Sequence, residues 1–119
     1  MVIKDDEVIF LKENKGSIVN IGSKVSITGQ GGTSAYAAAC GGRNALTREW
    51  AVELLPYSIR VNAVMVAESF TPLYEKWINT FPNPQEKLNQ IENKIPLEKR
   101  MTHPEEIANT VAFLLSEKS

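Results

Sequence analysis

The sequence predicts an α/β fold built on a short parallel sheet. Two segments rich in β-branched residues, 17–22 and 59–66, are typical of strands. Between them, residues 34–55 repeat apolar side chains at spacings of three and four, which is the pattern of a helix with one buried face. A strand, a long helix and a second strand form a βαβ unit, whose strands lie parallel with a right-handed crossover. We therefore expect residues 1–119 to form a single α/β domain.

The remaining elements follow from local signals. Three glycines in residues 26–33 predict a loop, and Pro56 ends the long helix because proline cannot continue one. The buried stripe of that helix is expected to contain Leu46, Trp50, Ala51, Leu54 and Leu55. The segment before the first strand, through Leu11, is expected to end a helix at the polar break 14–16.

Helices are also expected beyond the second strand. Pro72 suits the first turn of one helix, and residues 85–94 form another. Thr102 and His103, followed by a proline and two acids, mark the start of a last helix, with His103 flanking or capping it. Its buried face is expected to contain Ile107, Ala108, Val111, Leu114 and Leu115. Two strands leave both edges of the sheet unpaired, so the layer is expected to be incomplete.

Composition excludes several classes of function. The chain has 119 residues, 43% of them hydrophobic, and a formal net charge of −1, without the basic excess of a nucleic-acid-binding or lipid-binding face. No apolar run approaches the roughly 20 residues that span a membrane, and the acidic start is unlike a secretory signal. The single cysteine (Cys40) and single histidine (His103) provide no internal disulfide and no structural zinc site. These features predict a cytoplasmic, metal-free protein.

Several residues fall in the order of a known catalytic arrangement. Ser23 follows the first strand, at the edge where ligands bind in open α/β sheets, and Tyr36 comes thirteen residues later. The segments 16–23, 60–64 and 104–108 resemble the serine-bearing strand, the next strand and the late helix of the short-chain dehydrogenase/reductase family. The resemblance covers Gly16 through Leu115 and implies a Rossmann-like, doubly wound parallel sheet, here truncated at both ends.

The resemblance also implies a reaction. Members of this family interconvert a hydroxyl and a carbonyl on a small-molecule substrate with NAD or NADP. Segments 47–54 and 71–74 look like those of members that oxidise sugars such as L-fucose. By the same resemblance, Tyr36 would be the general acid–base, Ser23 would orient the substrate oxygen, and Thr71 would lie near the nicotinamide carboxamide. Tyr74, Trp77 and Phe81 either form an apolar wall for the substrate or pack a small lid onto the sheet.

One departure bears directly on the chemistry. The family has a lysine four residues after the tyrosine, whose charge favours phenolate and whose amine holds the cofactor ribose. This chain has Cys40 there. A thiol with an ordinary pKa near 8.5 is mostly neutral at pH 7. The phenol of a tyrosine with no nearby charge has a pKa near 10. We interpret Cys40 as an inert replacement; the alternative is a reactive thiol near a helix start.

Other departures concern the extent of the chain. No glycine-rich dinucleotide loop precedes Gly16, and the family's last strand has no counterpart before Ser119. Arg43 and Asn44 are expected to place polar groups on the helix face that meets a partner subunit. We therefore expect the fragment to be inactive by itself. The alternatives are a non-catalytic partner that forms a homo- or hetero-oligomer through the helix from Ser34 to Leu55, and a truncated gene remnant.

Overall fold

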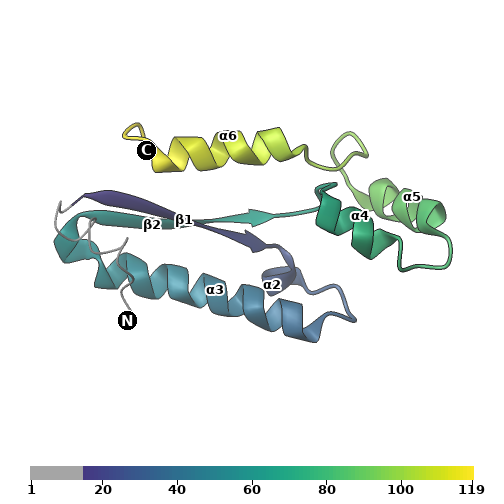
Figure 1. Cartoon of the computed structure of the whole chain (residues 1–119), viewed down its shortest axis with the longest axis horizontal. Coiled ribbons are helices and arrows are strands. Elements are labelled where there is room, and N and C mark those ends of the chain that lie inside the picture. Colours follow the sequence, from purple (N-terminus) through teal and green to yellow (C-terminus); the bar gives the residue numbers. More distant parts are fainter. Residues whose placement is uncertain (1–14) are drawn as a thin grey trace.

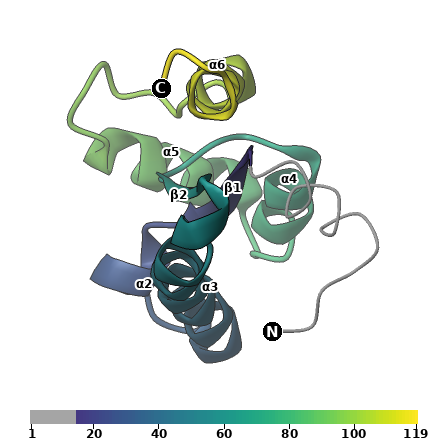
Figure 2. The same ribbon diagram turned by 90° about the vertical axis from the view of Figure 1, so that its left-hand side faces the viewer.

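A two-stranded sheet lies between two helical layers in the computed structural model, which describes residues 15–119 (Figures 1 and 2). The strands β1 (Gly16–Ser23) and β2 (Ile59–Val66) pair in parallel, with Gly16 opposite Ile59 and Ser23 opposite Val66. α3 (Ser34–Glu53) covers one face and α6 (Pro104–Leu115) covers the other. The α/β class, both strands and their parallel pairing are thus confirmed.

The connection between β1 and α3 differs from the sequence prediction. The segment expected to be a loop begins with a short helix, α2 (Val25–Thr28). Its single turn closes through a hydrogen bond from Thr28 N to Lys24 O (2.9 Å), and it ends at Gly29, whose φ of 68° a side chain would disfavour. Val25 is buried, and that contact offsets the weak helical preference of so short a segment. The prediction of a loop was wrong over three residues, 26–28.

The end of α3 agrees with the sequence to within two residues. α3 ends at Glu53, and the 3-10 turn η1 (Leu55–Tyr57) contains Pro56 near its start. Ser58 then takes a positive φ of 55° and directs the chain into β2.

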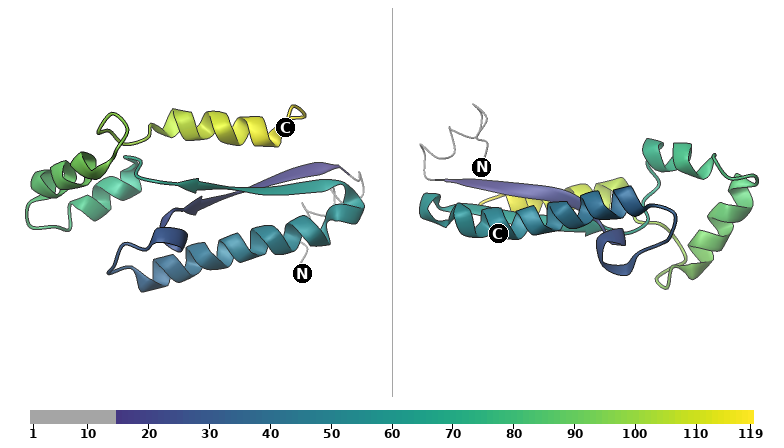
Figure 3. Two further views of the ribbon diagram at one scale, coloured as in Figure 1. Left: turned by 180° about the vertical axis from the view of Figure 1, so that it is seen from behind. Right: turned by 90° about the horizontal axis from the view of Figure 1, so that it is seen from below.

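The second half of the chain leaves the sheet and returns to it. α4 (Pro72–Ile78) and α5 (Pro84–Lys94) form a hairpin that extends beyond the carboxyl ends of the strands (Figure 3). The two chain segments that connect this hairpin to the rest pair through a single parallel bridge between Ser69 and Thr102. His103 occupies the N-cap position of α6, as the sequence predicts.

The apolar core is narrow and lies under the amino-terminal half of β2. Leu54, Ile59 and Val61 are buried together, and Ile18, Trp50 and Ala51 pack against them. Two residues of the predicted stripe on α3 are instead exposed: Leu46 by 45% and Leu55 by 66%. Because the sheet has only two strands, it covers a narrow part of the surface of α3. Residues at the margin of the predicted stripe therefore do not reach the sheet.

The last helix shows the same effect. Ile107, Val111 and Leu114 of α6 are half-buried, as predicted, whereas Ala108 and Leu115 are exposed. The predicted end of a helix through Leu11 lies outside the described residues. No helix between residues 15 and 119 is both long and apolar enough to cross a membrane.

Candidate active site

The candidate site lies at the carboxyl ends of the strands. Ser23 is the last residue of β1 and is 8% exposed. Its hydroxyl oxygen accepts a hydrogen bond from the backbone N–H of Val25 at 3.3 Å, which fixes the side chain at the start of α2. The hydroxyl proton has no acceptor among residues 15–119, so it can be donated to a ligand oxygen.

Tyr36 and Cys40 lie one turn apart on α3 but in different surroundings. Tyr36, in the first turn, is 50% exposed, while Cys40 is 1% exposed. The first turn of α3 lies beyond the ends of the strands, near α2 (Figure 1). The tyrosine ring is therefore accessible at the same end of the molecule as Ser23. Cys40 presents a buried thiol where a ligand would require an accessible group, and this burial favours the inert interpretation over the reactive one.

An ion pair that the sequence did not suggest joins the two strand ends. Lys24 Nζ lies 2.5 Å from Glu68 Oε1, and the backbone N–H of Lys24 donates to Val66 O at 3.0 Å. Lys24 follows Ser23 directly, so this pair brings an ammonium group to the edge of the sheet that carries the candidate catalytic serine. The only available signal was that each residue stands just after a predicted strand.

Thr71 caps the first helix of the hairpin. Its Oγ1 accepts a hydrogen bond from the backbone N–H of Tyr74 at 3.2 Å, which satisfies one of the free donors at the start of α4. As expected for a residue near the strand ends, Thr71 follows closely after β2. Whether it also contacts a nicotinamide remains a prediction.

Four aromatic rings form a row along α4. Ring centroids are separated by 5.9 Å (Phe70–Tyr74), 5.2 Å (Tyr74–Trp77) and 5.0 Å (Trp77–Phe81), in tilted or edge-to-face geometry. The Lys87 ammonium lies 5.0 Å from the Phe81 centroid and extends the row to α5. Partial burial, followed by the negative charges of Glu68 and Glu92, raises the pKa of the Tyr74 phenol to about 12. The rings hold the hairpin together and leave Phe70 44% exposed, so the row can serve both as packing and as a wall.

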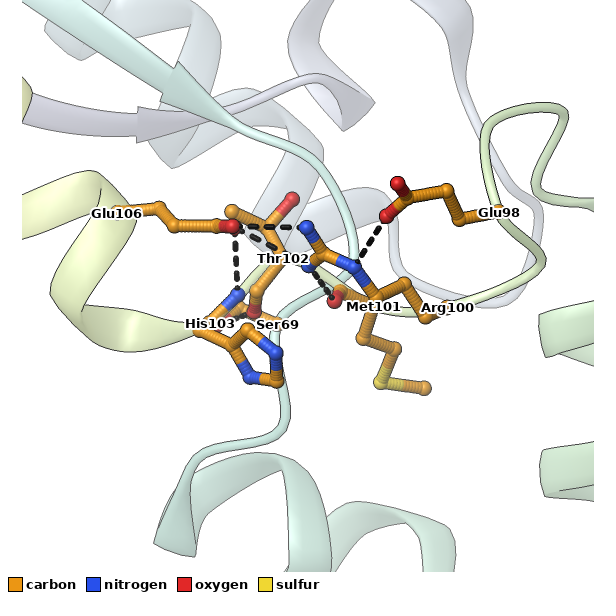
Figure 4. A network of polar contacts seen from close by, with 7 residues as sticks. All are labelled: Ser69, Glu98, Arg100, Met101, Thr102, His103 and Glu106. Atoms are coloured by element: carbon orange, nitrogen blue, oxygen red, sulfur yellow. Dashed lines mark hydrogen bonds and ion pairs between the residues drawn. The ribbon is translucent and has the colours of Figure 1, made fainter.

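A polar network holds the return path from the hairpin to α6 (Figure 4). Arg100 pairs with Glu98 (2.7 Å) and Glu106 (2.8 Å), while Glu106 also accepts the backbone N–H of His103 at 3.0 Å. These contacts lower the pKa of the Glu106 carboxyl to about 2, with the Arg100 hydrogen bond as the main cause. Ser69 Oγ donates to Thr102 O at 2.8 Å, which ties the network to the outgoing segment.

Arg43 is exposed and Asn44 is half-buried, and both side chains donate hydrogen bonds to neighbouring elements; that their helix face meets a partner subunit stays a prediction. Arg43 Nη1 donates to the backbone carbonyl of Ile21 at 2.7 Å, and Asn44 Nδ2 donates to Ser26 Oγ at 2.6 Å. Asn44 Oδ1 is buried, has no hydrogen-bond partner within residues 15–119, and would lie 3.3 Å from a Cβ on Gly22. Both side chains therefore face the carboxyl half of β1, where polar backbone and short side chains leave room for them.

The fold and this site define an α/β domain with polar side chains gathered at the carboxyl ends of two parallel strands. The family model described as "Enoyl-(Acyl carrier protein) reductase" matches residues 5–119. The chain belongs to the short-chain dehydrogenase/reductase family, which confirms the resemblance in the sequence.

Two curated relatives show the range of activities among similar proteins. The chain is 39% identical over 109 residues to 3-oxoacyl-[acyl-carrier-protein] reductase FabG of Thermotoga maritima. The aligned region covers 92% of this chain and 42% of the relative. It is 33% identical to L-fucose dehydrogenase of Bos taurus, covering 90% of this chain and 39% of the relative. The chain thus spans about two fifths of the length of these relatives.

Two solved structures confirm the Rossmann-type architecture. Cj0485 dehydrogenase is 52% identical in sequence and matches this structure with a TM-score of 0.83. The match covers 93% of this chain and 43% of that chain. NAD⁺-bound xylitol dehydrogenase is 29% identical, with a TM-score of 0.85 over 92% of this chain and 46% of that one. Members of the family use NAD or NADP.

Proposed function

We propose that this chain provides the proton-transfer and substrate side of an NAD(P)-dependent site that interconverts a hydroxyl and a carbonyl on a sugar-like small molecule. The observation that carries the proposal is the position of Ser23, a buried serine fixed at the carboxyl end of a parallel strand with its hydroxyl proton available. The accessible Tyr36 ring at the same end of the molecule and the similarity to L-fucose dehydrogenase support it.

Each residue has a distinct role in this proposal. Ser23 donates a hydrogen bond to the substrate oxygen and orients it. Tyr36 exchanges a proton with that oxygen as it changes between alcohol and carbonyl, which is general acid–base catalysis. The row from Phe70 to Phe81 would lie against the apolar face of the substrate, since aromatic rings pack well against the C–H face of a sugar.

The residues fit the family's cofactor only in part. Thr71 offers a hydroxyl near the strand ends, as a nicotinamide carboxamide would require. At position 40, however, the side chain is a thiol that is 1% exposed, which can neither donate to a ribose as an ammonium does nor supply a positive charge.

The second part of the proposal is that this chain does not catalyse the reaction, because it lacks the positive charge of the family's lysine. A cation beside a phenol favours phenolate, and each unit of pKa corresponds to 1.36 kcal/mol. Position 40 holds a thiol in place of such a cation, so this chain lacks the charge that would favour proton exchange one helical turn from Tyr36. The ammonium of Lys24 is held by Glu68, so its charge is already largely balanced.

A hybrid enzyme tests the proposal. The portion of Cj0485 dehydrogenase that this chain does not match would be fused to this chain, and turnover would be followed by nicotinamide absorbance with L-fucose and L-xylulose. We expect Cys40→Lys to raise kcat at neutral pH at least about a hundredfold, the equivalent of two pKa units. Adding Tyr36→Phe to Cys40→Lys should remove that gain.

Cys40→Ala is the matched control, because it removes the thiol without adding a charge. An equal gain from Cys40→Ala would contradict the role of the charge. Rapid turnover by the chain with Cys40 intact would contradict the proposed inactivity. Circular dichroism of each variant would establish that it folds like the parent hybrid.

A second candidate function is a non-catalytic subunit. Leu46 and Val52 of α3 are 45% and 70% exposed, and such exposed apolar side chains favour a partner on this helix. Analytical ultracentrifugation of the chain alone and mixed with a complete member of the family tests it: Val52→Lys should convert the oligomer into a monomer. A chain that stays monomeric in both samples would contradict this function.

A further inference from the structure

Lys24 and Glu68 form an ion pair at the point where both strands end. Lys24 directly follows β1 and Glu68 stands two residues after the end of β2, with Lys24 Nζ 2.5 Å from Glu68 Oε1. The backbone N–H of Lys24 donates to Val66 O at 3.0 Å. The backbone carbonyl of Glu68 accepts from the N–H of Thr102 at 2.9 Å. Because the ammonium side chain is 39% exposed and the carboxylate side chain 21%, the pair is held in place and still accessible to a ligand.

The pair lies between the two parts of the candidate site. On one side, Lys24 is the direct neighbour of Ser23. On the other side, the chain runs from Glu68 through Phe70 to the hairpin of α4 and α5, beyond the carboxyl ends of the strands (Figure 3). The Tyr74 phenol has a raised pKa, first through burial and then through the negative charge of Glu68, so this carboxylate acts on the aromatic row. A molecule that contacts both Ser23 and the row would therefore lie beside the ion pair.

The fold does not account for two charges at this point. A partly exposed ion pair adds little to stability, and apolar residues of similar volume are often at least as stable in its place. The pair also leaves hydrogen-bonding capacity unused, since Lys24 contacts Oε1 of Glu68 and Oε2 forms no hydrogen bond within residues 15–119. A carboxylate accepts hydrogen bonds at both oxygens. Glu68 can therefore accept a hydrogen bond from a ligand while Lys24 holds it.

An available carboxylate oxygen favours a ligand hydroxyl. In the proposed function, Ser23 donates its hydroxyl proton to the reacting oxygen of the substrate, so Oε2 of Glu68 is available to another group of the same molecule. A second hydroxyl donates the hydrogen bond that the carboxylate requires. A hydrocarbon or acyl chain would instead displace water from Oε2 and replace it with no donor, which costs free energy.

We propose that Glu68, positioned by Lys24, accepts a hydrogen bond from a second hydroxyl group of the substrate and so selects polyhydroxylated small molecules over molecules with a single oxygen. Glu68 is then a specificity-determining residue, and Lys24 is a positioning residue that acts through it. This inference rests on the proposed function for the place of the substrate, but it concerns which molecule binds and does not require turnover.

Ligand-observed NMR on the full chain tests the proposal. Saturation-transfer difference spectra would follow titrations with cis-cyclohexane-1,2-diol and with cyclohexanol, which share one ring and differ by one hydroxyl group. We expect the diol to bind about tenfold more tightly than cyclohexanol, and Glu68→Leu to remove this preference. Glu68→Gln should keep part of the preference, because its amide oxygen still accepts a hydrogen bond.

Variants at two other positions complete the test. Lys24→Met should reduce the preference for the diol, because the carboxylate is no longer held, and Lys24→Arg should preserve it. The matched control is Glu75→Leu, which removes an exposed carboxylate from α4 and should leave the preference within twofold. Circular dichroism of each variant would establish that it folds like the parent chain.

The results separate this inference from the proposed function. If Cys40→Lys raises turnover of the hybrid enzyme but Glu68→Leu leaves the preference for the diol unchanged, only this inference fails. If the preference depends on Glu68 while the hybrid gains no turnover, the binding role stands and the proposed function fails. Equal binding of the two probes, absence of binding by both, or an equal loss of preference in Glu75→Leu would overturn the inference.

Discussion

The two ends of the sheet differ in what covers them. At the amino ends of the strands, Leu54, Ile59 and Val61 are buried together against Ile18 and Trp50. At the carboxyl ends, the neighbours of the sheet are polar: the Lys24–Glu68 pair, the Asn44 amide and the Ser23 hydroxyl. One end thus provides apolar burial and the other provides hydrogen-bonding groups. The comparison separates the part that stabilises the domain from the part that can bind a ligand.

α3 connects these two ends and changes character along its length. Its last turns, around Trp50, pack on the core, whereas its first turns carry Tyr36, Cys40 and the two polar side chains that face β1. A substitution on this helix should therefore affect folding or chemistry according to the end at which it lies.

The largest expected effect is at the core end. Leu54→Ala should lower the free energy of unfolding by about 2–5 kcal/mol, since it removes a side chain that is 4% exposed from the centre of the cluster. Urea unfolding followed by circular dichroism measures the change. Leu55→Ala is the matched control: that side chain is 66% exposed, and its loss should cost less than about 0.5 kcal/mol. Equal losses would show that the core does not lie where the structure places it.

The fold was largely predictable because its signals are local. The β-branched segments gave both strands, and strand–helix–strand order gave their parallel pairing. Burial along the helices was less predictable, because Leu46 and Leu55 repeat at helical spacing but the sheet beneath them has only two strands. The helix α2 was missed because its four residues depend on the burial of Val25 rather than on intrinsic preference.

The site was predictable only where a motif carried it. Ser23, Tyr36, Cys40 and Thr71 came from spacing and family resemblance, and their roles remain predictions. The Lys24–Glu68 pair and the contacts of Arg100 with Glu106 join residues whose geometry depends on how the loops fold, so no sequence spacing indicates them. The hydrogen bond from Asn44 to Ser26 was not predicted for a similar reason, because Ser26 lies in α2, a helix that the sequence did not indicate.

Asn44 permits a second test, with a smaller effect of the opposite sign. Its Oδ1 is buried without a partner in the described part of the chain, which costs about 1–3 kcal/mol, while Asn44 Nδ2 gains about 1 kcal/mol from its bond to Ser26. Asn44→Ala should therefore raise the free energy of unfolding by about 1 kcal/mol, including the better helical propensity of alanine. Asn109→Ala, on the exposed side of α6, controls for propensity and should gain only about half as much. Destabilisation by Asn44→Ala would show that the buried amide is fully satisfied.

The smallest expected effect concerns the phenol of Tyr74 at the carboxyl end. Its pKa is raised to about 12, first by burial and then by the charge of Glu68, with Glu92 contributing less. Glu68→Gln removes one negative charge but not the burial, so the pKa of Tyr74 should fall by less than about one unit and stay above the ordinary value near 10. Ultraviolet titration measures it, with Tyr74→Phe identifying which of the three tyrosines contributes.

The same shift predicts how stability depends on pH. Because the folded state holds the Tyr74 proton more tightly than the unfolded state does, it binds more protons between pH 10 and 12, and stability should decline across that window as pH rises. The decline should be smaller in Tyr74→Phe, measured by urea unfolding at each pH. An equal decline in both chains would mean that the Tyr74 phenol does not cause the pH dependence. A Tyr74 pKa that Glu68→Gln leaves unchanged would mean that the carboxylate does not act on the aromatic row. The polar end of the sheet would then be electrostatically separate from the hairpin beside it.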